Sequence, residues 1–414
     1  MPSFGFRVFA LSMFCASCVG VDTNSFVLGE LESLDPPLEE GSLWPALSVN
    51  GDEIVLSWQE SDDGESWFVK TATMSEVGWS PAHTVAQSEP QRQFFVNWAD
   101  FASVRPVGDG ILSAHWLVRG PAGGYDYGIR FATSTDKGAT WTEPWTPHED
   151  GTATEHGFVS KFPLLGGGMG MVWLDGRNTL GGHGSGGETS RGAMTLRYRS
   201  IGGNGVPGPE ELVDESICDC CQTDAAMTSL GPVVVYRDRT NEEIRDIYVT
   251  RLVDGKWTPG TPVHEDLWVI PACPVNGPAV AAMDQDVAVA WFTGGQDDPR
   301  VQVVFSGDTG ETFGLPTRVD DGNPLGRVDV VLLRDGTALV AWMERKSDGA
   351  EVRVRRVTPE GGASSVAVVT TTSPGRDSGF PQMIQDAKGR VVFAWTQTGD
   401  ASQIRMARTV ESFE

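Results

Sequence analysis

The sequence has 414 residues, of which 21% are charged, and it carries 50 glycines and a formal net charge of −25. A chain of this length and apolar content is typical of a soluble globular protein with a large core. The strong negative charge argues against binding to nucleic acid, whose phosphates require Lys and Arg, and against adsorption to anionic lipid.

The first eighteen residues, MPSFGFRVFALSMFCASC, are typical of an export signal. Arg7 precedes a short apolar run that is too short to span a bilayer. CASC is similar to a lipobox, in which Ala16 and Ser17 precede a Cys18 that is lipidated, although Cys15 stands where leucine is common. We expect a lipoprotein of the outer membrane or cell surface, with a periplasmic or secreted protein as alternatives. The lipid anchor would be its only contact with a membrane.

Seven apolar runs that end in an aromatic residue recur at intervals of 51 to 63 residues. Each run follows another apolar segment, and a Gly/Asp turn usually separates the two, which is typical of a β-hairpin. A polar loop and an alternating segment, such as YGIRFATS or QIRMART, then follow. The seven aromatic residues are Trp58, Trp116, Trp173, Tyr236, Trp291, Trp342 and Trp395.

Seven such units without a convincing amphipathic helix predict an all-β protein, a β-propeller of four-stranded antiparallel blades. The recurring aromatic residues are expected to fill the space between blades. The last unit stops soon after its third strand, so the segment SFVLGELESL at 25–34 is expected to supply the outer strand of the final blade. We divide the chain into a signal at 1–18, a linker and closing strand at 19–40, and the propeller at 41–414.

Two stretches that follow third strands have the same residue spacing, namely STDKGATW at 134–141 and SGDTGETF at 306–313. Both match the Asp-box, S-x-D-x-G-x-T-W/F, and the chain thereby resembles the sialidase superfamily over nearly all of its length. The resemblance implies that the boxes are structural turns. It also makes six blades, as in sialidases, the alternative to seven. The box residues are Ser134, Asp136, Gly138, Trp141, Ser306, Asp308, Gly310 and Phe313.

In a propeller, the loops that enter first strands and those that leave second strands meet at one face. The resemblance implies a tyrosine nucleophile, a partnering glutamate and an aspartic acid, and by residue type these are Tyr236, Glu344 and Asp175. Arginine forks bind carboxylates, so the same loops predict a site for a small anionic ligand or glycan. Alternatively, the Asp and Arg side chains pair with each other. The candidate ligand-binding residues are Arg177, Arg237, Asp238, Arg239, Arg327 and Arg345.

The cysteines also enter first strands. Cys218, Cys220 and Cys221 enter the fourth blade, Cys273 enters the fifth, and His156 enters the third. Soft thiolates with an imidazole would suit copper(I) or zinc. The alternatives are a disulfide between Cys273 and one cysteine of the cluster, a vicinal disulfide between Cys220 and Cys221, or unpaired thiols.

Three functions follow from the sequence. The first is an exported, monomeric binding propeller that holds copper, zinc or an anionic ligand at the channel mouth. The second is a sialidase-type exo-glycosidase with a rearranged site, and the third is a cell-surface interaction module with a structural disulfide. Whether the protein is an enzyme stays open at this level.

Overall fold

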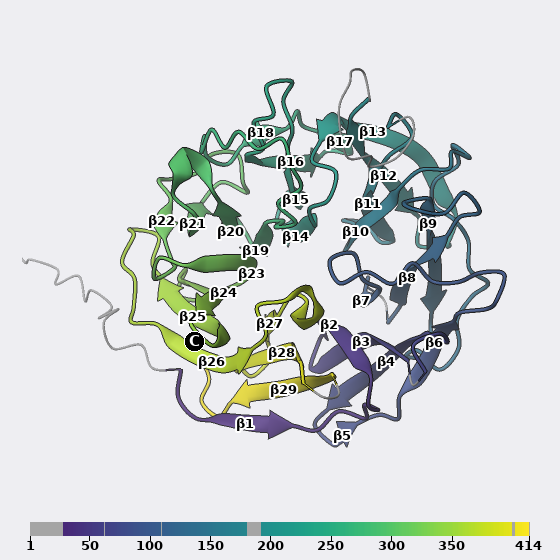
Figure 1. Cartoon of the computed structure of the whole chain (residues 1–414), viewed down its shortest axis with the longest axis horizontal. Coiled ribbons are helices and arrows are strands. Elements are labelled where there is room, and N and C mark those ends of the chain that lie inside the picture. The colour runs from purple at the N-terminus through teal and green to yellow at the C-terminus, as the bar shows by residue number, and fades with distance from the viewer. Residues whose placement is uncertain (1–27, 62, 109, 180–191, 400–401, 414) are drawn as a thin grey trace, which may run out of the picture.

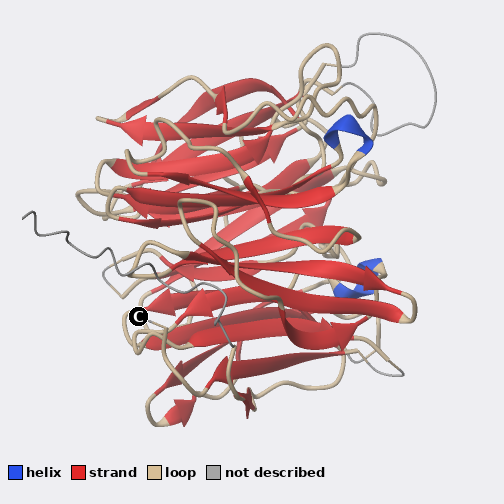
Figure 2. Ribbon diagram, turned by 90° about the vertical axis from the view of Figure 1, so that its left-hand side faces the viewer, coloured by secondary structure: helices blue, strands red, loops and turns tan. Residues whose placement is uncertain are grey.

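The computed structural model describes residues 28–61, 63–108, 110–179, 192–399 and 402–413. Its strands form seven antiparallel sheets arranged in a ring, with one strand of each sheet nearest the central axis (Figure 1). Figure 2 shows that strands and their connecting loops make up nearly all of the described chain. The prediction of a seven-bladed all-β propeller is confirmed, and the six-bladed alternative is wrong.

We number the blades in chain order and give their strands from the axis outward. The first contains β2 (Ser42–Asn50), β3 (Glu53–Glu60), β4 (Phe68–Ser75), β5 (Gly78–Trp79) and β6 (His83–Gln87). The second contains β7 (Ser103–Pro106), β8 (Leu112–Arg119) and β9 (Tyr127–Ser134), and the third contains β10 (His156–Pro163), β11 (Met169–Asp175), β12 (Met194–Ile201) and β13 (Pro207–Ile217).

The fourth blade contains β14 (Asp224–Thr228), β15 (Gly231–Arg237), β16 (Ile247–Val253), β17 (Lys256–Trp257) and β18 (Thr261–Pro262). The fifth contains β19 (Ala279–Met283), β20 (Asp286–Thr293), β21 (Arg300–Ser306) and β22 (Thr317–Arg318). The sixth contains β23 (Pro324–Leu332), β24 (Ala338–Lys346), β25 (Gly349–Val357) and β26 (Ala367–Thr372). The seventh contains β27 (Gln382–Gln385), β28 (Val391–Gln397), β29 (Gln403–Thr409) and β1 (Leu31–Leu34).

The described residues also form two short 3₁₀ helices, η2 (Gly295–Asp297) and η3 (Arg376–Ser378). None of the helices in this part of the chain has the length and apolar character needed to cross a membrane.

Burial follows from the position of each strand in its blade. Every residue of β11 and β15 is buried, because the second strand of a blade packs between the two neighbouring blades. The outer strand β13 is mostly exposed or half-buried. This gradient explains why the second strands are continuous apolar runs, whereas the outer strands carry little sequence signal.

The recurring aromatic residues lie between blades, as predicted. Trp58 of the first blade packs with Ile404 and Val392 of the seventh. Trp173 of the third blade packs with Phe131 of the second. Each blade therefore presents a large side chain to the blade before it, and burial of these side chains holds the ring together.

The ring is closed by β1, which pairs antiparallel with β29 from Leu31 opposite Thr409 to Leu34 opposite Met406. An ion pair between Glu32 and Arg408 crosses the same two strands. The prediction that the segment at 25–34 supplies the outer strand of the last blade is confirmed. The pairing hides an edge of β29 that would otherwise be open.

The two Asp-box stretches form the same hydrogen-bonded turn. In the second blade, Ser134 Oγ donates to Asp136 Oδ1 at 2.8 Å and accepts the backbone N–H of Gly138 at 2.9 Å. Gly138 has a φ of 88°, a conformation that favours glycine. Hydrogen bonds from the hydroxyl and backbone N–H of Thr140 lower the pKa of Asp136 to about 2. The fifth-blade turn, at Ser306, Asp308 and Gly310, repeats this arrangement.

Candidate functional site

A cleft of about 520 Å³ opens where the chain enters the innermost strands of the blades. Residues from the entries to the first, second, third, fourth, fifth and seventh blades line it, so it lies across one end of the central channel. Its aromatic lining consists of Trp44, Trp98, Tyr125 and Phe158, and its main polar lining consists of Asn97, Glu155, Arg376 and Asp377.

Unusual backbone conformations place several of these side chains. Trp44 in β2 and Phe158 in β10 both have a φ of 53°, and each lies at a register shift in the pairing of its strand with the next. Val275, a third lining residue, has a φ of 49°, which is rare for a β-branched residue. Bulges and left-handed non-glycine residues concentrate at functional sites, where they redirect side chains.

Trp98 is held rigidly at one wall of the cleft. Its ring stacks on Phe380 with centroids 5.5 Å apart, and the guanidinium of Arg327 lies 4.8 Å from its centroid. Arg327 is buried and donates through Nη1 to Ser378 Oγ at 2.7 Å and to the Gly379 carbonyl at 3.0 Å. The predicted ligand-binding residue Arg327 therefore lies behind the wall, where it supports Trp98.

Glu155 belongs to a buried cluster of two carboxyl groups and a phenol, the other members being Asp100 and Tyr127. Tyr127 Oη donates to Glu155 Oε1 at 2.6 Å and lies 3.0 Å from Asp100 Oδ2. A backbone bridge joins Tyr127 to Glu155, and the backbone N–H of Phe158 donates to Asp100 Oδ1 at 2.8 Å. A Cβ on Gly157 would lie 1.9 Å from Asp100 Oδ2, so only glycine fits there.

Burial sets the charge of this cluster. It raises the pKa of Glu155 to about 8, although the hydrogen bond from Tyr127 acts in the opposite direction. It also raises the pKa of Asp100 to about 7, against hydrogen bonds from Phe158 and Tyr127. A carboxylic acid that stays protonated at neutral pH and borders a cleft is able to donate a proton to a ligand.

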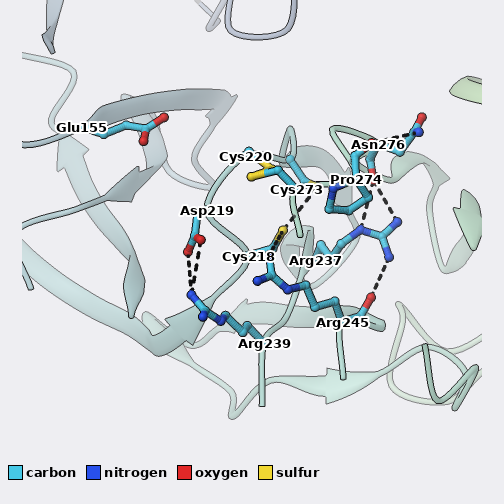
Figure 3. Close-up of a disulfide and its surroundings, with 12 residues drawn as sticks. Glu155, Cys218, Asp219, Cys220, Arg237, Arg239, Arg245, Cys273, Pro274 and Asn276 are labelled. Atoms are coloured by element: carbon cyan, nitrogen blue, oxygen red, sulfur yellow. Dashed lines mark hydrogen bonds and ion pairs between the residues drawn. A yellow bond between two sulfur atoms is a disulfide. The ribbon is translucent and has the colours of Figure 1, made fainter. Parts of the chain in front are cut away.

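Two of the cysteines, Cys220 and Cys273, line the cleft. Figure 3 shows the disulfide between them and its surroundings. Cys220 and Cys273 are joined in a disulfide with Cα atoms 5.9 Å apart, whereas Cys218 and Cys221 are buried free thiols. The alternative of a disulfide between Cys273 and the cluster is confirmed. The disulfide removes two of the five donors proposed for a copper or zinc site, so a site that uses all five does not fit this structure.

The two thiols lie in a cationic environment. Their Sγ atoms are 3.5 Å apart, and Arg245 Nη1 lies 3.3 Å from Cys218 Sγ. Burial alone would raise the pKa of Cys218, but the hydrogen bond from Cys221 and the charges of Arg245 and Arg237 lower it. The pKa of Cys221 is raised, mainly by burial. Cys218 is therefore the sulfur that carries negative charge more readily.

His156 belongs to a different cluster, on the outer side of the third blade's entry. Its ring stacks on His148 with centroids 3.8 Å apart, and its Nε2 lies 3.0 Å from Asp150 Oδ1 and 3.6 Å from Asp175 Oδ2. Because the backbone N–H of Ile129 donates to His148 Nε2, the proton of a neutral His148 lies on Nδ1, which faces Asp150. The two histidines thus belong to a network of ion pairs and hydrogen bonds. In this network, Nδ1 of a neutral His148 carries a proton and has no lone pair to offer a metal.

The three predicted catalytic residues are not brought together, and none of them lines the cleft. Asp175 accepts the indole N–H of Trp173 and pairs with Arg177 at 2.7 Å. Tyr236 is buried and donates to Asp214 at 2.6 Å. In the sixth blade, Glu344 accepts the indole N–H of Trp342 at 2.7 Å.

The remaining predicted ligand-binding residues have partners within the protein or lie apart from the cleft. Arg177 pairs with Glu210 as well as Asp175, and Arg239 pairs with Asp219 and Glu243. Arg237 is buried and donates to the backbone carbonyls of Asn276, Arg245 and Phe292. Asp238 does not line the cleft, and burial raises its pKa to about 7. Arg345 is exposed on β24 and does not line the cleft either. For Arg177 and Arg239, the structure therefore matches the alternative in which Arg and acidic side chains pair with each other instead of binding a ligand.

Several residues of the cleft are not among the predicted site residues. The register of the repeats does place Asn97 and Trp98 at the entry to the second blade, on the face of the channel, and both line the cleft. Nothing in the sequence distinguishes Trp44, Tyr125 or Glu155 in this way. Their position depends on bulges and loop conformations that no local motif announces.

A comparison with models of protein families finds no match, and a comparison with curated proteins finds none either. Solved structures do share the fold. The endosialidase of phage phi92 has 10% identity and a TM-score of 0.51, over 93% of this chain and 69% of that one. The polysaccharide lyase Uly1 has 9% identity and a TM-score of 0.50, over 88% and 90% of the two chains.

The sialidase of Trypanosoma rangeli has 13% identity and a TM-score of 0.47, over 78% of this chain and 56% of that one. The predicted resemblance to sialidases is therefore confirmed at the level of the fold, through the endosialidase. At these identities, the likeness does not extend to activity.

Proposed function

We propose that the protein binds a saccharide in the cleft at the end of the channel. The observation that carries the proposal is the lining, which contains four aromatic residues together with amide, carboxyl and guanidinium groups from several blades. Aromatic faces pack against the C–H groups of sugar rings, and amide, carboxyl and guanidinium groups form hydrogen bonds with hydroxyl groups. The left-handed backbones of Trp44, Phe158 and Val275 support the same assignment.

The structural neighbours provide secondary support. By their names, the phage phi92 protein is an endosialidase and Uly1 is a polysaccharide lyase, so both act on carbohydrates. A propeller that places an aromatic cleft across its channel suits a chain-like ligand, because the lining comes from entries all around the axis.

Binding is tested by titrating the full chain with a panel of neutral and acidic oligosaccharides in a calorimeter. We expect at least one class to bind, and we expect Trp98→Ala to weaken that binding by 10-fold or more, on the order of 1.4 kcal/mol. The matched control is Trp79→Ala, which removes an indole from outer strand β5. Absence of binding across the panel, or equal losses in the two variants, would contradict the proposal.

A second candidate function is cleavage of the bound saccharide by acid catalysis. The observation that favours it is Glu155, whose pKa is raised by burial to about 8 while it borders the cleft. Such a group delivers a proton to a departing glycosidic oxygen at neutral pH. Asp377, which is exposed on the same cleft, is the second carboxyl group available to the reaction.

The two candidates separate at one substitution. Glu155→Gln keeps an oxygen that accepts the Tyr127 hydroxyl, so saccharide binding should persist while any cleavage is lost. In the wild type, cleavage should fall as the pH rises through about 8, because Glu155 then loses its proton. If both proteins bind the saccharide and neither cleaves it, the first candidate function, binding alone, is supported. Cleavage by the Glu155→Gln variant would exclude Glu155 as the acid.

Export and metal binding stay predictions. Residues 1–27, including Cys18 of the proposed lipobox, lie outside the described residues. For copper or zinc, the sulfur donors left outside the disulfide are Cys218 and Cys221.

A further inference from the structure

Four sulfur atoms lie close together at the entries to the fourth and fifth blades, where Cys220 and Cys273 line the cleft. The Sγ atoms of Cys218, Cys220 and Cys221 all lie within 4.8 Å of one another, and Cys220 is bonded to Cys273 (Figure 3). The cluster thus contains one disulfide and two thiols, Cys218 and Cys221, whose sulfurs are 3.5 Å apart. Thiols this close to a disulfide are within reach of exchange with it.

Cys218 is equipped to act as the attacking sulfur. The guanidinium of Arg245 is 3.3 Å from its Sγ and is itself paired with Glu243 at 2.8 Å. The backbone N–H of Cys218 donates to the carbonyl of Arg237, which fixes the residue in place. A fixed cation beside a thiol favours the thiolate, which is the nucleophile in exchange.

The four sulfurs differ in access. Cys218 and Cys221 are each 1% exposed, whereas Cys273 is exposed at the rim of the cleft. A reagent in solution therefore meets Cys273 before the buried pair. Cys220 connects the exposed cysteine with the buried pair, because it is bonded to Cys273 and its Sγ lies within 4.8 Å of the Sγ atoms of both thiols.

We propose that this cluster is a thiol–disulfide exchange site, in which the disulfide moves between Cys220–Cys273 and Cys218–Cys221. In the first step, the Cys218 thiolate attacks Cys220 Sγ. The Cys218–Cys220 bond forms, the Cys220–Cys273 bond breaks, and Cys273 leaves as a thiolate that takes up a proton. In the second step, the Cys221 thiol gives up its proton and its sulfur attacks Cys218 Sγ. The Cys218–Cys221 bond forms, the Cys218–Cys220 bond breaks, and Cys220 leaves as a thiolate that takes up a proton.

Both isomers contain one disulfide and two thiols, so the exchange needs no external oxidant or reductant. Its consequence is chemical: the second isomer presents a reactive thiol, Cys273, at the rim of the cleft. That thiol is available to external disulfides, which it attacks to form a mixed disulfide. Cys220 and Cys273 share the cleft with Glu155 and the aromatic residues, but the exchange uses only the four sulfur atoms, so alkylation tests it independently of saccharide binding.

The experiment is differential alkylation of the native full chain without reducing agent. The folded protein is incubated with N-ethylmaleimide for hours, then denatured, reduced and labelled with an isotopic form of the reagent, and fragment spectra assign each cysteine. We expect the first label on Cys273, and a Cys218–Cys221 disulfide in the unreduced digest. A wild type that keeps only Cys220–Cys273 and never labels Cys273 would overturn the proposal.

Two variants test the order of the steps. Cys218→Ser removes the attacking sulfur, so Cys273 should lose its label. Cys221→Ser allows only the first step, so Cys273 should be labelled while a Cys218–Cys220 disulfide accumulates. Labelling of Cys273 in Cys218→Ser would contradict the assigned nucleophile. A stoichiometric copper or zinc ion that protects Cys218 and Cys221 in the wild type would also overturn the proposal. If a variant fails to fold, the labels and disulfides assigned in the wild type decide whether the exchange takes place.

Discussion

At the scale of single residues, a hydrogen-bond acceptor two positions after a recurring tryptophan is part of the repeat. Asp175 and Glu344, which residue type suggests as catalytic groups, occupy this position. Each accepts the indole N–H of its own blade, as the equivalent acceptors of the first and seventh blades do. The pairs, at 2.9, 3.0, 2.7 and 3.2 Å, are Trp58 with Glu60, Trp173 with Asp175, Trp342 with Glu344, and Trp395 with Gln397.

Glu344→Ala should therefore lower stability and leave saccharide binding unchanged. Glu344 is buried and also accepts the backbone N–H of Asn323 at 2.7 Å, so the change removes the acceptor of two donors, of which the Trp342 indole is buried. We expect a loss of about 1–3 kcal/mol in the free energy of unfolding, measured with urea. Glu344→Gln, which keeps one oxygen, is the control and should lose less. A fully stable alanine variant that no longer binds the saccharide would instead favour a role in the site.

The imidazole of His156 makes part of the stability depend on pH. Although burial acts in the opposite direction, the hydrogen bond to Asp150 and the charge of Asp175 raise its pKa. The facing groups also include Arg177, 3.6 Å from Asp150, and His148, whose own pKa is lowered by burial. Because the folded pKa is raised, the stabilisation is complete below about pH 6.5 and is lost as the pH rises through the folded value.

The variant His156→Gln should accordingly lose more stability at pH 6 than at pH 9. The measurement is the difference in the free energy of unfolding between wild type and variant at the two pH values. His83→Gln, in β6 of the first blade, provides the control for the loss of an imidazole outside this cluster. A His156→Gln effect that grows toward alkaline pH would contradict the protonated state assigned to this ring.

The sequence predicts the place of such residues better than their partners. The register of the repeat correctly puts His156 and the cysteines at strand entries. It does not show that His156 faces Asp175 across the β10–β11 pair, nor that Cys220 rather than Cys218 reaches Cys273. Those outcomes depend on side-chain direction, and the bulge after Gly157 changes that direction.

At the scale of elements, the closing strand β1 can be predicted from the sequence, whereas the bulges in the inner strands β2 and β10 cannot. The closing strand β1 follows from counting, because the last unit lacks an outer strand and the segment at 25–34 lacks a partner. The bulges in β2 and β10 place Trp44 and Phe158 in a backbone conformation that large side chains rarely adopt. Propensity argues against such a conformation, so the aromatic lining of the cleft could not be predicted from the sequence.

Removal of β1 should destabilise the ring and open an edge. A chain that begins after Leu34 loses the ladder to β29, the ion pair of Glu32 with Arg408, and the burial of Leu28. We expect a lower melting temperature and concentration-dependent light scattering, because the exposed edge of β29 can pair with another molecule. A chain that begins with Met placed before Leu28 is the control and should resemble the wild type. Equal melting temperatures would show that β1 does not close the ring.

At the scale of the whole molecule, the disulfide links the entries of two adjacent blades. Cys220 precedes β14 and Cys273 precedes β19, and the bond encloses a chain separation of 53 residues. In the chain-entropy model, a loop of this length stabilises the folded state by about 4 kcal/mol.

The double variant Cys220→Ser/Cys273→Ser should therefore unfold at lower urea concentration, with a loss of up to about 4 kcal/mol. The control is Cys218→Ser, which removes a buried thiol and the attacking sulfur and so leaves that disulfide in place. If the double variant were as stable as the wild type, the disulfide would have no stabilising role, and its retention would have to be explained by chemistry at the cleft.

Almost all of the architecture could be predicted from the sequence, because each second strand repeats the same apolar run and aromatic ending. The ligand site could not, because a propeller assembles it from single residues of many blades rather than from one motif. Trp98, Glu155 and Arg376 come together only after the ring has closed.

The pairing of β1 with β29 also makes the blade order cyclic. Since Leu31 lies opposite Thr409, the two ends of the described chain meet within one blade, and a short linker between them would turn the polypeptide into a loop. A circular permutant opened between β6 and β7 would then contain the same seven sheets, with all four strands of the seventh blade consecutive in sequence. The split of that blade is thus a property of chain connectivity, and the packing around the ring has no first or last member.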